Sequence, residues 1–299
     1  MAVGRPVRQG ISLRRHSTFR IGGKADFFFA AGSARELEDC LRLAHDRGVP
    51  HYVIGAGTNL LFDDAGFRGL IIKNEVRGIE RKSGESRVRV RSGTALSELV
   101  AFCLEEGLEG LEFAAGIPGT VGGAVYGNAG AWGSSIGQRL VEGLLLDETA
   151  RELPAGNDFF RFGYRQSHLK TRHLTLLEAV FELRTGDRGL IRERIEESLA
   201  KRKAPCPSDK MAYCGSFFKN PVLPDGTKLA AGRLLEKVGA KELKYGSAAV
   251  YAGHANFIVN LGRARAADIL NLAREMKARV EREFGVRLEE EVIYLPAGP

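Results

Sequence analysis

Ser216 stands in a segment whose residue types could carry acid–base chemistry. The segment reads Cys214-Gly215-Ser216-Phe217-Phe218-Lys219-Asn220-Pro221. It is not the G-x-S-x-G elbow of a hydrolase nucleophile, because a glycine directly precedes Ser216 and none follows two residues later. A serine hydroxyl is a weak acid, so it can protonate only a strongly basic acceptor such as a carbanion or an enolate. The alternative interpretation is structural, a strand edge that ends at Pro221.

Two charged positions could act beside such a proton donor. Arg165 lies in Phe162-Gly163-Tyr164-Arg165-Gln166-Ser167, a loop that precedes a predicted strand. Its planar guanidinium suits two oxygens of a carboxylate or phosphate, although a loop arginine is usually a surface charge. In Leu288-Glu289-Glu290-Glu291-Val292, strand alternation would place Glu289 and Glu291 on one face. One carboxyl could then face a cleft, or the pair could simply mark a charged strand entry.

Glycine is the most unusual feature of the composition. The chain has 37 glycines in 299 residues, or 12%, against about 7% in an ordinary protein. Eight of them fall between Gly116 and Gly137. Because glycine weakens helices and strands, we expect residues 110–137 to form loops or tight turns whose backbone lies against another part of the structure or a ligand. Together with Gly55-Ala56-Gly57-Thr58-Asn59-Leu60-Leu61, it could present backbone amides to a phosphate.

Neither glycine segment matches a common nucleotide-binding motif. A Rossmann fingerprint needs a third glycine where Leu60 stands, and a helix where residues 62–66 (FDDAG) predict a turn. No G-x-x-x-x-G-K-[ST] sequence occurs, so a P-loop nucleotidase is excluded. Each segment alone is typical of a tight turn. Two of them in one region favour a large cofactor that carries phosphate.

Charge and composition narrow the function classes further. The balance of 44 Lys+Arg and 37 Asp+Glu gives +7, but the basic residues alternate with acids, as in residues 192–203 (RERIEESLAKRK), which disfavours nucleic-acid binding. No run of about 18 apolar residues predicts a membrane span, and the N-terminus lacks the apolar block of a secretory signal. Cys40, Cys103, Cys206 and Cys214 have no metal-ligand or paired spacing. We therefore expect reduced thiols, no metal site and a cytoplasmic location.

These candidate residues must be positioned by alternating helices and strands. Apolar spacing predicts helices over 34–48, 95–107 and 188–203, and a long last helix with an apolar stripe from Ile269 to Val280. Strands are predicted after a turn at Gly22–Gly23 and over residues 52–54, 69–73, 87–91, 141–146, 174–183 and 288–295. The basic, proline-containing residues 201–210 predict a linker to a second domain. The alternation indicates an α/β or α+β protein.

In their order and spacing, the motifs resemble the UDP-N-acetylenolpyruvoylglucosamine reductase family. The resemblance begins at residues 18–23 (TFRIGG) and passes through 55–61, 116–133, 163–165 and 215–221. It continues through residues 231–236 (AGRLLE) and 254–260 (HANFIVN) to 288–292. Each block alone is weak, but together they cover nearly the whole chain. About 50 residues separate Arg165 from Ser216, so the chain resembles the shorter type within the family.

The resemblance implies an α+β fold, with a FAD-binding region of the vanillyl-alcohol-oxidase (PCMH) type and a C-terminal α+β substrate-binding domain. The implied boundaries are an N-terminal extension over 1–15, the FAD-binding region over 16–203 in two subdomains (about 16–75 and 76–203), and the C-terminal domain over 204–299. The FAD pyrophosphate would lie against the two glycine segments. The implied FAD-binding residues are Gly55, Ala56, Gly57, Thr58, Asn59, Leu60, Gly116, Pro118, Gly119, Thr120, Gly122, Gly123, Asn128, Ala129 and Gly130.

The implied activity is the NADPH-dependent reduction of UDP-N-acetylglucosamine enolpyruvate to UDP-N-acetylmuramate, which serves peptidoglycan synthesis and thereby cell shape and division. NADPH would reduce FAD, leave, and be replaced by the substrate at the same face, so no Rossmann motif is needed. Hydride from flavin N5 would add to the outer carbon of the enol ether, and charge would build on the adjacent carbon and its carboxylate. By similarity, Arg165 and Glu291 would hold that carboxylate and Ser216 would deliver the proton. Substrate contacts would come from Tyr164, Lys219, Asn220 and Asn256.

Three positions depart from the family pattern. Tyr251 and Gly253 stand where members often have Ser and Lys, and Ile293 stands where many have Arg. Contacts to the substrate diphosphate are therefore left open by the sequence. The implied partners are small molecules only, with a monomer and no nucleic acid or membrane. An alternative is another FAD-dependent oxidoreductase of the same fold that acts on a sugar or hydroxy acid, which would not need Ser216, Arg165 and Glu291 together.

Overall fold

The computed structural model describes residues 6–298, apart from 82–83, 173, 204–205 and 209–210. The chain divides into two compact units. Unit 1 comprises residues 1–9, 27–56 and 69–203, and unit 2 comprises residues 10–26, 57–68 and 204–299. Two short N-terminal stretches therefore belong to the same unit as the C-terminal third of the chain.

The first sheet has the strand order β1-β2-β5-β3, and its strands β1, β2 and β5 each have residues in both units. The strands are β1 (Arg8–Ser12), β2 (Lys24–Ala31), β3 (His51–Ile54) and β5 (Phe67–Asn74), and helix α1 spans Ala34–Asp46. Ser33 caps α1 by accepting a hydrogen bond from the Glu36 amide. The apolar stripe predicted for this helix is confirmed, because Leu37, Cys40, Leu41 and Ala44 are buried in the cluster that contains Phe29 and Ile72.

The second sheet of unit 1 is antiparallel throughout, in the order β12-β11-β13-β7-β6. Its strands are β6 (Ile79–Glu80), β7 (Arg87–Arg91), β11 (Leu140–Leu146), β12 (Glu152–Gly156) and β13 (Thr175–Glu182). Strand β7 shows the predicted alternation: Val88 and Val90 are fully buried, whereas Arg89 and Arg91 both pair with Glu178. One face of this sheet therefore contributes to the main core of unit 1.

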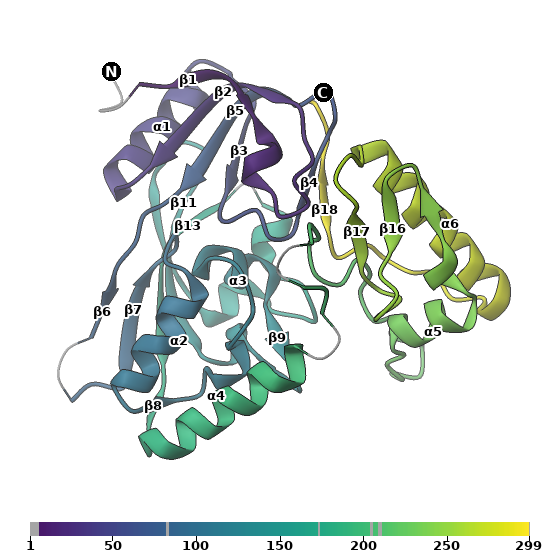
Figure 1. Cartoon of the computed structure of the whole chain (residues 1–299). Coiled ribbons are helices and arrows are strands. Elements are labelled where there is room, and N and C mark those ends of the chain that lie inside the picture. The colour runs from purple at the N-terminus through teal and green to yellow at the C-terminus, as the bar shows by residue number, and fades with distance from the viewer. Residues whose placement is uncertain (1–5, 82–83, 173, 204–205, 209–210, 299) are drawn as a thin grey trace. The chain divides into compact units, whose positions relative to one another are not determined.

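Three helices contribute side chains to that core, and Figure 1 labels them. They are α2 (Leu96–Glu105), α3 (Val121–Gly127) and α4 (Arg188–Lys203). Two short antiparallel pairs complete the unit: β8 (Leu108–Glu109) with β14 (Arg184–Thr185), and β9 (Gly130–Ala131) with β10 (Ser134–Ser135).

Helix α3 corrects the expectation that residues 110–137 contain only loops and turns. It forms despite Gly122 and Gly123 because both ends are capped and one face is buried. Thr120 accepts the Gly123 amide at the start, and Asn128 adopts the left-handed conformation at the end (φ 44°). A Cβ atom at Gly122 would lie only 3.1 Å from Ser92. Glycine here allows a helix to pack closely, so tertiary contact outweighs helix propensity.

Unit 2 has a three-stranded antiparallel sheet with two helices. The sheet contains β15 (Lys244–Tyr245), β16 (Ala248–Val250) and β17 (Ile258–Asn260), and the helices are α5 (Ala231–Lys237) and α6 (Ala266–Phe284). The predicted stripe of α6 is confirmed, since its members from Ile269 to Val280 are buried in one cluster. Asp64 ties residues 57–68 to this unit, because its carboxylate accepts the amides of Ala266 (2.8 Å) and Ala267 (3.2 Å).

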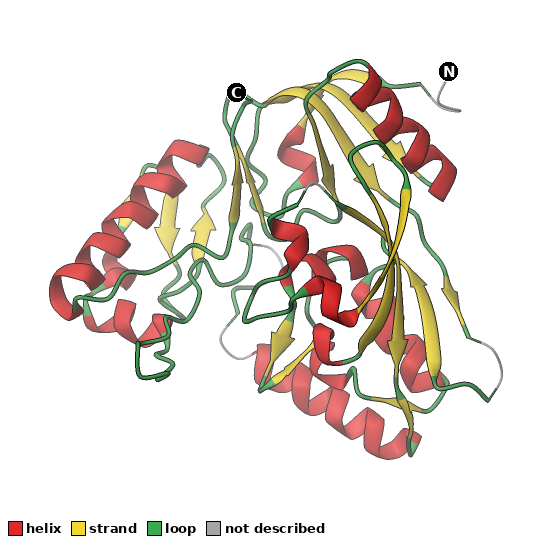
Figure 2. Cartoon of the chain, turned by 180° about the vertical axis from the view of Figure 1, so that it is seen from behind, coloured by secondary structure: helices red, strands yellow, loops and turns green. Residues whose placement is uncertain are grey.

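Large parts of unit 2 are irregular. Between Cys206 and Ala230 the described residues form only isolated bridges, and Figure 2 draws them as loops. The strand predicted over 288–295 is shorter: β18 spans Ile293–Leu295 and pairs in parallel with β4 (Leu60–Phe62). The reason is a change of partner at Glu291. Its own amide donates to Phe217, whereas the next bonded amide, that of Ile293, donates to Asn59.

Candidate active site

In unit 1, the two predicted glycine segments meet at the N-terminus of α3. A Cβ atom at Gly55 would lie 2.4 Å from Oγ1 of Thr120, so residue 55 has no room for a side chain while Thr120 keeps this position. Gly119 has φ +130°, a conformation that side-chain-bearing residues rarely adopt. Residues 55 and 120 of the two segments therefore lie next to each other.

The backbone amides of this region are only partly available to a ligand. Val121 donates to Thr94 (2.9 Å), Gly122 donates to Ser92 (2.7 Å), and Gly123 donates to the Thr120 hydroxyl (3.2 Å). For the amides of Gly119 and Thr120, no protein acceptor is found among the residues that the structure describes. An anion approaching this turn would thus meet two amides and not a row of five.

Asn128 joins the end of α3 to two other parts of the predicted site. Its side-chain amide donates to the Gly163 carbonyl (2.8 Å), and its side-chain oxygen accepts the Gly137 amide (3.0 Å). The next residues, Ala129 and Gly130, lead into the β9–β10 hairpin. Asn128 therefore holds the turn that carries Arg165 against the glycine-rich segment.

Arg165 is placed by a tight turn whose ends, Gly163 and Gln166, exchange both backbone hydrogen bonds. Its backbone has φ 55°, its guanidinium donates to the Gly130 carbonyl (2.9 Å), and its carbonyl accepts the Lys170 ammonium (2.7 Å). The Tyr164 ring lies 5.5 Å from the guanidinium carbon. Unit 1 thus brings Arg165 and Tyr164 together with Gly130, which the sequence placed in the FAD group.

A tyrosine pair lies beside this turn, and nothing in the sequence singled it out. The side chains of Tyr52 and Tyr126 interact, and burial is the main cause that raises the pKa of both hydroxyls. The neighbouring Tyr126 hydroxyl raises the pKa of Tyr52 further. The Lys170 ammonium lies 5.7 Å from the Tyr126 ring centroid. Only the fold places β3 beside α3, so sequence spacing could not reveal this group.

In unit 2, residues 57–60 are held by the N-terminal stretch. A Cβ atom at Gly57 would lie 1.9 Å from the His16 carbonyl oxygen, and the Gly57 carbonyl accepts the Thr18 amide (3.1 Å). The Ser17 hydroxyl donates to the Leu60 carbonyl (2.6 Å). Thr58 and Asn59 are therefore presented by a rigid turn.

Ser216 and Glu291 lie on neighbouring segments of unit 2. The Glu291 amide donates to the carbonyl of Phe217 (2.8 Å), the residue that follows Ser216, and Phe218 forms a bridge with Glu290. Both Ser216 and Glu291 are half-buried. The fold therefore brings together two catalytic candidates that are 75 residues apart in the sequence.

The three polar residues predicted to contact substrate in unit 2 all have protein partners. Lys219 pairs with Glu289 at 3.0 Å, and the Asn220 side-chain oxygen accepts the Ala231 amide at 3.0 Å, at the start of α5. Asn256 is 3% exposed, and both of its side-chain amide atoms bond to the backbone of Phe218. Of the three, Asn256 is the least accessible to a ligand.

Two of the positions that depart from the family pattern lie against each other. A Cβ atom at Gly253 would lie 2.5 Å from the ring of Tyr251, so a side chain at 253 requires that ring to move. His254 packs against Gly232, and burial lowers the pKa of its imidazole. The third position, Ile293, is the half-buried first residue of β18.

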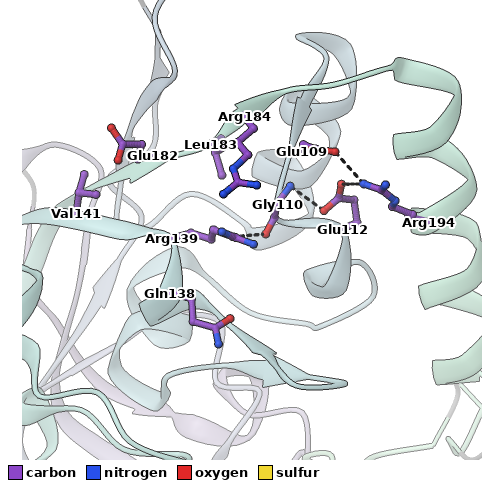
Figure 3. A pocket seen from close by; sticks show the side chains of 10 residues that line it. All are labelled: Glu109, Gly110, Glu112, Gln138, Arg139, Val141, Glu182, Leu183, Arg184 and Arg194. Carbon is purple, nitrogen blue, oxygen red and sulfur yellow. Dashed lines mark hydrogen bonds and ion pairs between the residues drawn. The ribbon is translucent and has the colours of Figure 1, made fainter.

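A separate cavity of about 290 Å³ in unit 1 contains none of the predicted site residues. Its lining includes three glutamates and three arginines, shown in Figure 3. Arg194 pairs with Glu109 (2.9 Å) and Glu112 (3.6 Å), and Arg139 donates to the Gly110 carbonyl (3.2 Å). These contacts join α4 to the residues around β8, so the lining reads as a structural ion-pair cluster.

Other reactive groups are either buried or spread apart. Burial raises the pKa of the Cys40 and Cys103 thiols to about 12 and that of Cys214 to about 11. In the part of the chain that is described, no three His, Cys, Asp or Glu side chains gather as a metal site would require. Likewise, none of the described helices is both long and apolar enough to cross a bilayer.

Comparisons with known proteins cover both units. Residues 25–147 match the FAD binding domain family, and residues 207–295 match the family described as UDP-N-acetylenolpyruvoylglucosamine reductase, C-terminal domain. The predicted α+β class, with a FAD-binding region and a separate C-terminal region, is confirmed by these matches and by the observed elements.

Full-length relatives carry the same name. The chain is 40% identical to the UDP-N-acetylenolpyruvoylglucosamine reductase of Desulforamulus reducens and 41% identical to that of Moorella thermoacetica, each over 94% of this chain and 90% of the relative. The crystal structure of the corresponding enzyme from Thermus caldophilus is 32% identical and superposes with a TM-score of 0.82, covering 97% of this chain and 99% of the other.

Proposed function

This chain belongs to the UDP-N-acetylenolpyruvoylglucosamine reductase family, and from that membership we propose that it reduces UDP-N-acetylglucosamine enolpyruvate to UDP-N-acetylmuramate. It is an FAD-dependent oxidoreductase, since a FAD-binding domain accompanies the family's C-terminal domain. A sugar or hydroxy-acid oxidase is not favoured, because the similarity extends over 94% of the chain and includes the C-terminal domain.

The residues of unit 1 fit a phosphate-bearing cofactor, although fewer amides take part than the glycine count suggests. Gly55 and Gly119 have no side chains that would block this turn. The amides of Gly119 and Thr120 are the two that could donate to a pyrophosphate. We assign the FAD pyrophosphate to these two amides, with Gly55 and Ala56 beside them. Bound FAD supplies the hydride chemistry that no side chain of the chain can provide.

Thr58 and Asn59 in unit 2 are proposed to complete the cofactor contacts. The turn that carries them is fixed by Ser17 and by the Thr18–Gly57 hydrogen bond. A pre-fixed turn pays little ordering entropy on binding, which favours tight retention of the cofactor.

The proposed roles at the reacting carbons follow from charge. A hydride added to the outer carbon of the enol ether leaves negative charge on the adjacent carbon and its carboxylate. Arg165 would bind that carboxylate with its planar guanidinium, which the Gly130 carbonyl helps to orient. Ser216 would then donate its proton to the adjacent carbon, which is basic enough to take it.

Glu291 is proposed to stabilise the same developing charge. Two negative groups repel each other, so Glu291 can help only while its carboxyl carries a proton that it shares with the substrate oxygens. The observation that carries the assignment of Ser216 and Glu291 is the 2.8 Å hydrogen bond from the Glu291 amide to Phe217, because it holds the two segments in register.

The remaining assignments are also proposals. NADPH is the proposed hydride donor, Tyr164, Lys219 and Asn220 are proposed substrate contacts, and the protein is proposed to work as a cytoplasmic monomer in peptidoglycan precursor synthesis. Lys219 would have to exchange its Glu289 partner for the substrate diphosphate. Such an exchange is feasible because the Glu289 carboxylate is largely exposed, and exposed ion pairs contribute little stability.

The test is a turnover measurement on the purified holoprotein. We expect it to be yellow and to consume one NADPH for each enolpyruvyl substrate, with UDP-N-acetylmuramate identified by mass spectrometry. Protein that stays inert after reconstitution with FAD would overturn the proposal. So would rapid reoxidation by oxygen that is coupled to turnover of a simple sugar or hydroxy acid.

A further inference from the structure

Asn256 makes an unusual set of hydrogen bonds to the two residues that follow Ser216. Its side-chain oxygen accepts the Phe218 amide and its side-chain nitrogen donates to the Phe218 carbonyl, both at 2.9 Å. Its backbone carbonyl also accepts the Phe217 amide at 2.8 Å. Asn256 is 3% exposed. It supplies this segment with the backbone hydrogen-bond partners that a neighbouring strand supplies in a sheet.

On its other side, the same segment is bonded to the residues around Glu291. Phe217 accepts the Glu291 amide (2.8 Å), and the Lys219 amide donates to the Glu289 carbonyl (2.9 Å). The Glu291 carbonyl in turn accepts the side-chain nitrogen of Asn59 at 2.9 Å. A row of hydrogen bonds therefore crosses four segments, with an asparagine at each end.

The row replaces regular secondary structure where none is present. Among the described residues near Ser216 there are only isolated bridges, and β18 begins two residues after Glu291. The rings of Phe217 and Phe218 are buried in the core of unit 2, so packing holds this backbone together with the hydrogen bonds. Removing one end of the row would allow the segment to shift sideways.

The geometry assigns Asn256 a positioning role: it sets the segment that carries Ser216 at the correct distance from Glu291, and Asn59 secures Glu291 from the opposite side. This assignment replaces a substrate contact as the function of Asn256. It rests on the proposed function for the identity of the reaction, but the contacts themselves do not depend on it.

The substitution Asn256→Asp tests this role because it replaces the side-chain nitrogen by an oxygen and so removes the donor to the Phe218 carbonyl. An ionised aspartate can still accept the Phe218 amide, but its second oxygen faces the Phe218 carbonyl and repels it. A protonated aspartate can donate to that carbonyl and restore both bonds. Among the titratable groups on the bonded segments, the Nδ1 of His254 accepts the backbone amide of Asn256. Glu290 pairs with Lys277, and Glu289 pairs with Lys219.

The experiment compares wild type, Asn256→Asp and the control Asn271→Asp as full-length holoproteins. Asn271 lies in α6 of the same unit and accepts a hydrogen bond from Arg274. At pH 8 we expect Asn256→Asp to slow reoxidation of the reduced flavin by substrate at least about tenfold. Its reduction by NADPH should stay within about twofold of wild type, and its defect relative to wild type should shrink as the pH is lowered to about 5.5. The control should follow wild type at every pH.

A second measurement separates positioning from loss of the fold. Amide hydrogen exchange at Phe218 and Glu291 should be faster in Asn256→Asp, while the α6 core exchanges as in wild type. Unchanged exchange at both amides, or equal slowing of both half-reactions, would overturn the positioning role. If wild type itself fails to turn over the enolpyruvyl substrate, the proposed function is wrong, and the exchange result alone then decides whether Asn256 holds the segment.

Discussion

The predicted FAD residues around Thr120 and the predicted catalytic residues around Ser216 are held in place by different means. In unit 1, a capped helix and close glycine contacts fix the backbone, and that backbone is proposed to be the binding group. In unit 2, Ser216 and Glu291 lie on segments without regular structure, and the side chains of Asn59 and Asn256 fix them.

The difference follows from what each region has to present. A phosphate needs amide groups and little side-chain bulk, so the local sequence itself carries the signal as glycine. A proton donor and a carboxyl group have to be placed relative to each other, and the residues that place them come from distant parts of the chain. We therefore expect substitutions around Ser216 to change rates, and substitutions at the start of α3 to change cofactor affinity.

The largest effect should come from Ser216→Ala. It removes the proposed proton donor, so reoxidation of reduced flavin by substrate should fall by about 10²- to 10⁴-fold, with flavin reduction by NADPH nearly unchanged. Stopped-flow measurement of the two half-reactions checks this, and Ser247→Ala in the same unit serves as the control. Equal losses in both half-reactions would contradict the proton-donor role.

A smaller effect on rate is expected from Arg165→Lys. Lysine keeps the charge but cannot form the planar fork, so one oriented contact to the developing carboxylate charge is lost. Turnover should fall by about 100-fold, while FAD remains bound. Steady-state kinetics on this variant and on Arg161→Lys, an exposed arginine four residues earlier, would measure it. Unaltered turnover would show that Arg165 does not bind the carboxylate of the substrate.

Thr120→Ala should change cofactor affinity and stability more than it changes the reaction rate. Loss of the cap on α3 should lower the free energy of unfolding by about 1 kcal/mol and weaken FAD binding, with little change in the rate of the saturated holoenzyme. Thr120→Ser keeps the hydroxyl and should behave as wild type. Titration of the apoprotein with FAD measures the affinity, and urea unfolding measures the free energy of unfolding. A large loss of rate at full FAD occupancy would contradict the assignment of Thr120 to cofactor binding.

The smallest effect concerns His254. Burial lowers the pKa of its imidazole in the folded state below the ordinary 6.5. The unfolded chain therefore binds the proton more readily, so the His254 contribution to stability is present above pH 6.5 and is lost as the pH falls below it. His254→Gln should remove that part of the pH dependence, measured by urea unfolding at pH 5 and pH 7.5. If the change in stability between the two pH values is the same in both proteins, His254 binds protons equally in the folded and unfolded states.

Much of the architecture could be predicted because local patterns carry it. The strand over Arg87–Arg91 and the buried stripes of α1 and α6 follow from side-chain periodicity alone. Residues 116–137 were the main error. Their glycine density predicts loops, yet α3 forms because Thr120 and Asn128 cap it and Gly122 lets it lie against Ser92. Propensity is a weak preference that a close tertiary contact can reverse.

By itself, the sequence determined the family, which relatives covering most of the chain support, and it predicted that the glycine segments, Arg165, Ser216 and Glu291 form the site. Only the tertiary structure decided how they are held. It bonded the amides of Val121, Gly122 and Gly123 to protein acceptors, brought Tyr52 to Tyr126, and bonded the Asn256 side chain to the Phe218 backbone. The physical reason is that a hydrogen bond between residues far apart in the chain leaves no periodic trace in the sequence of either partner.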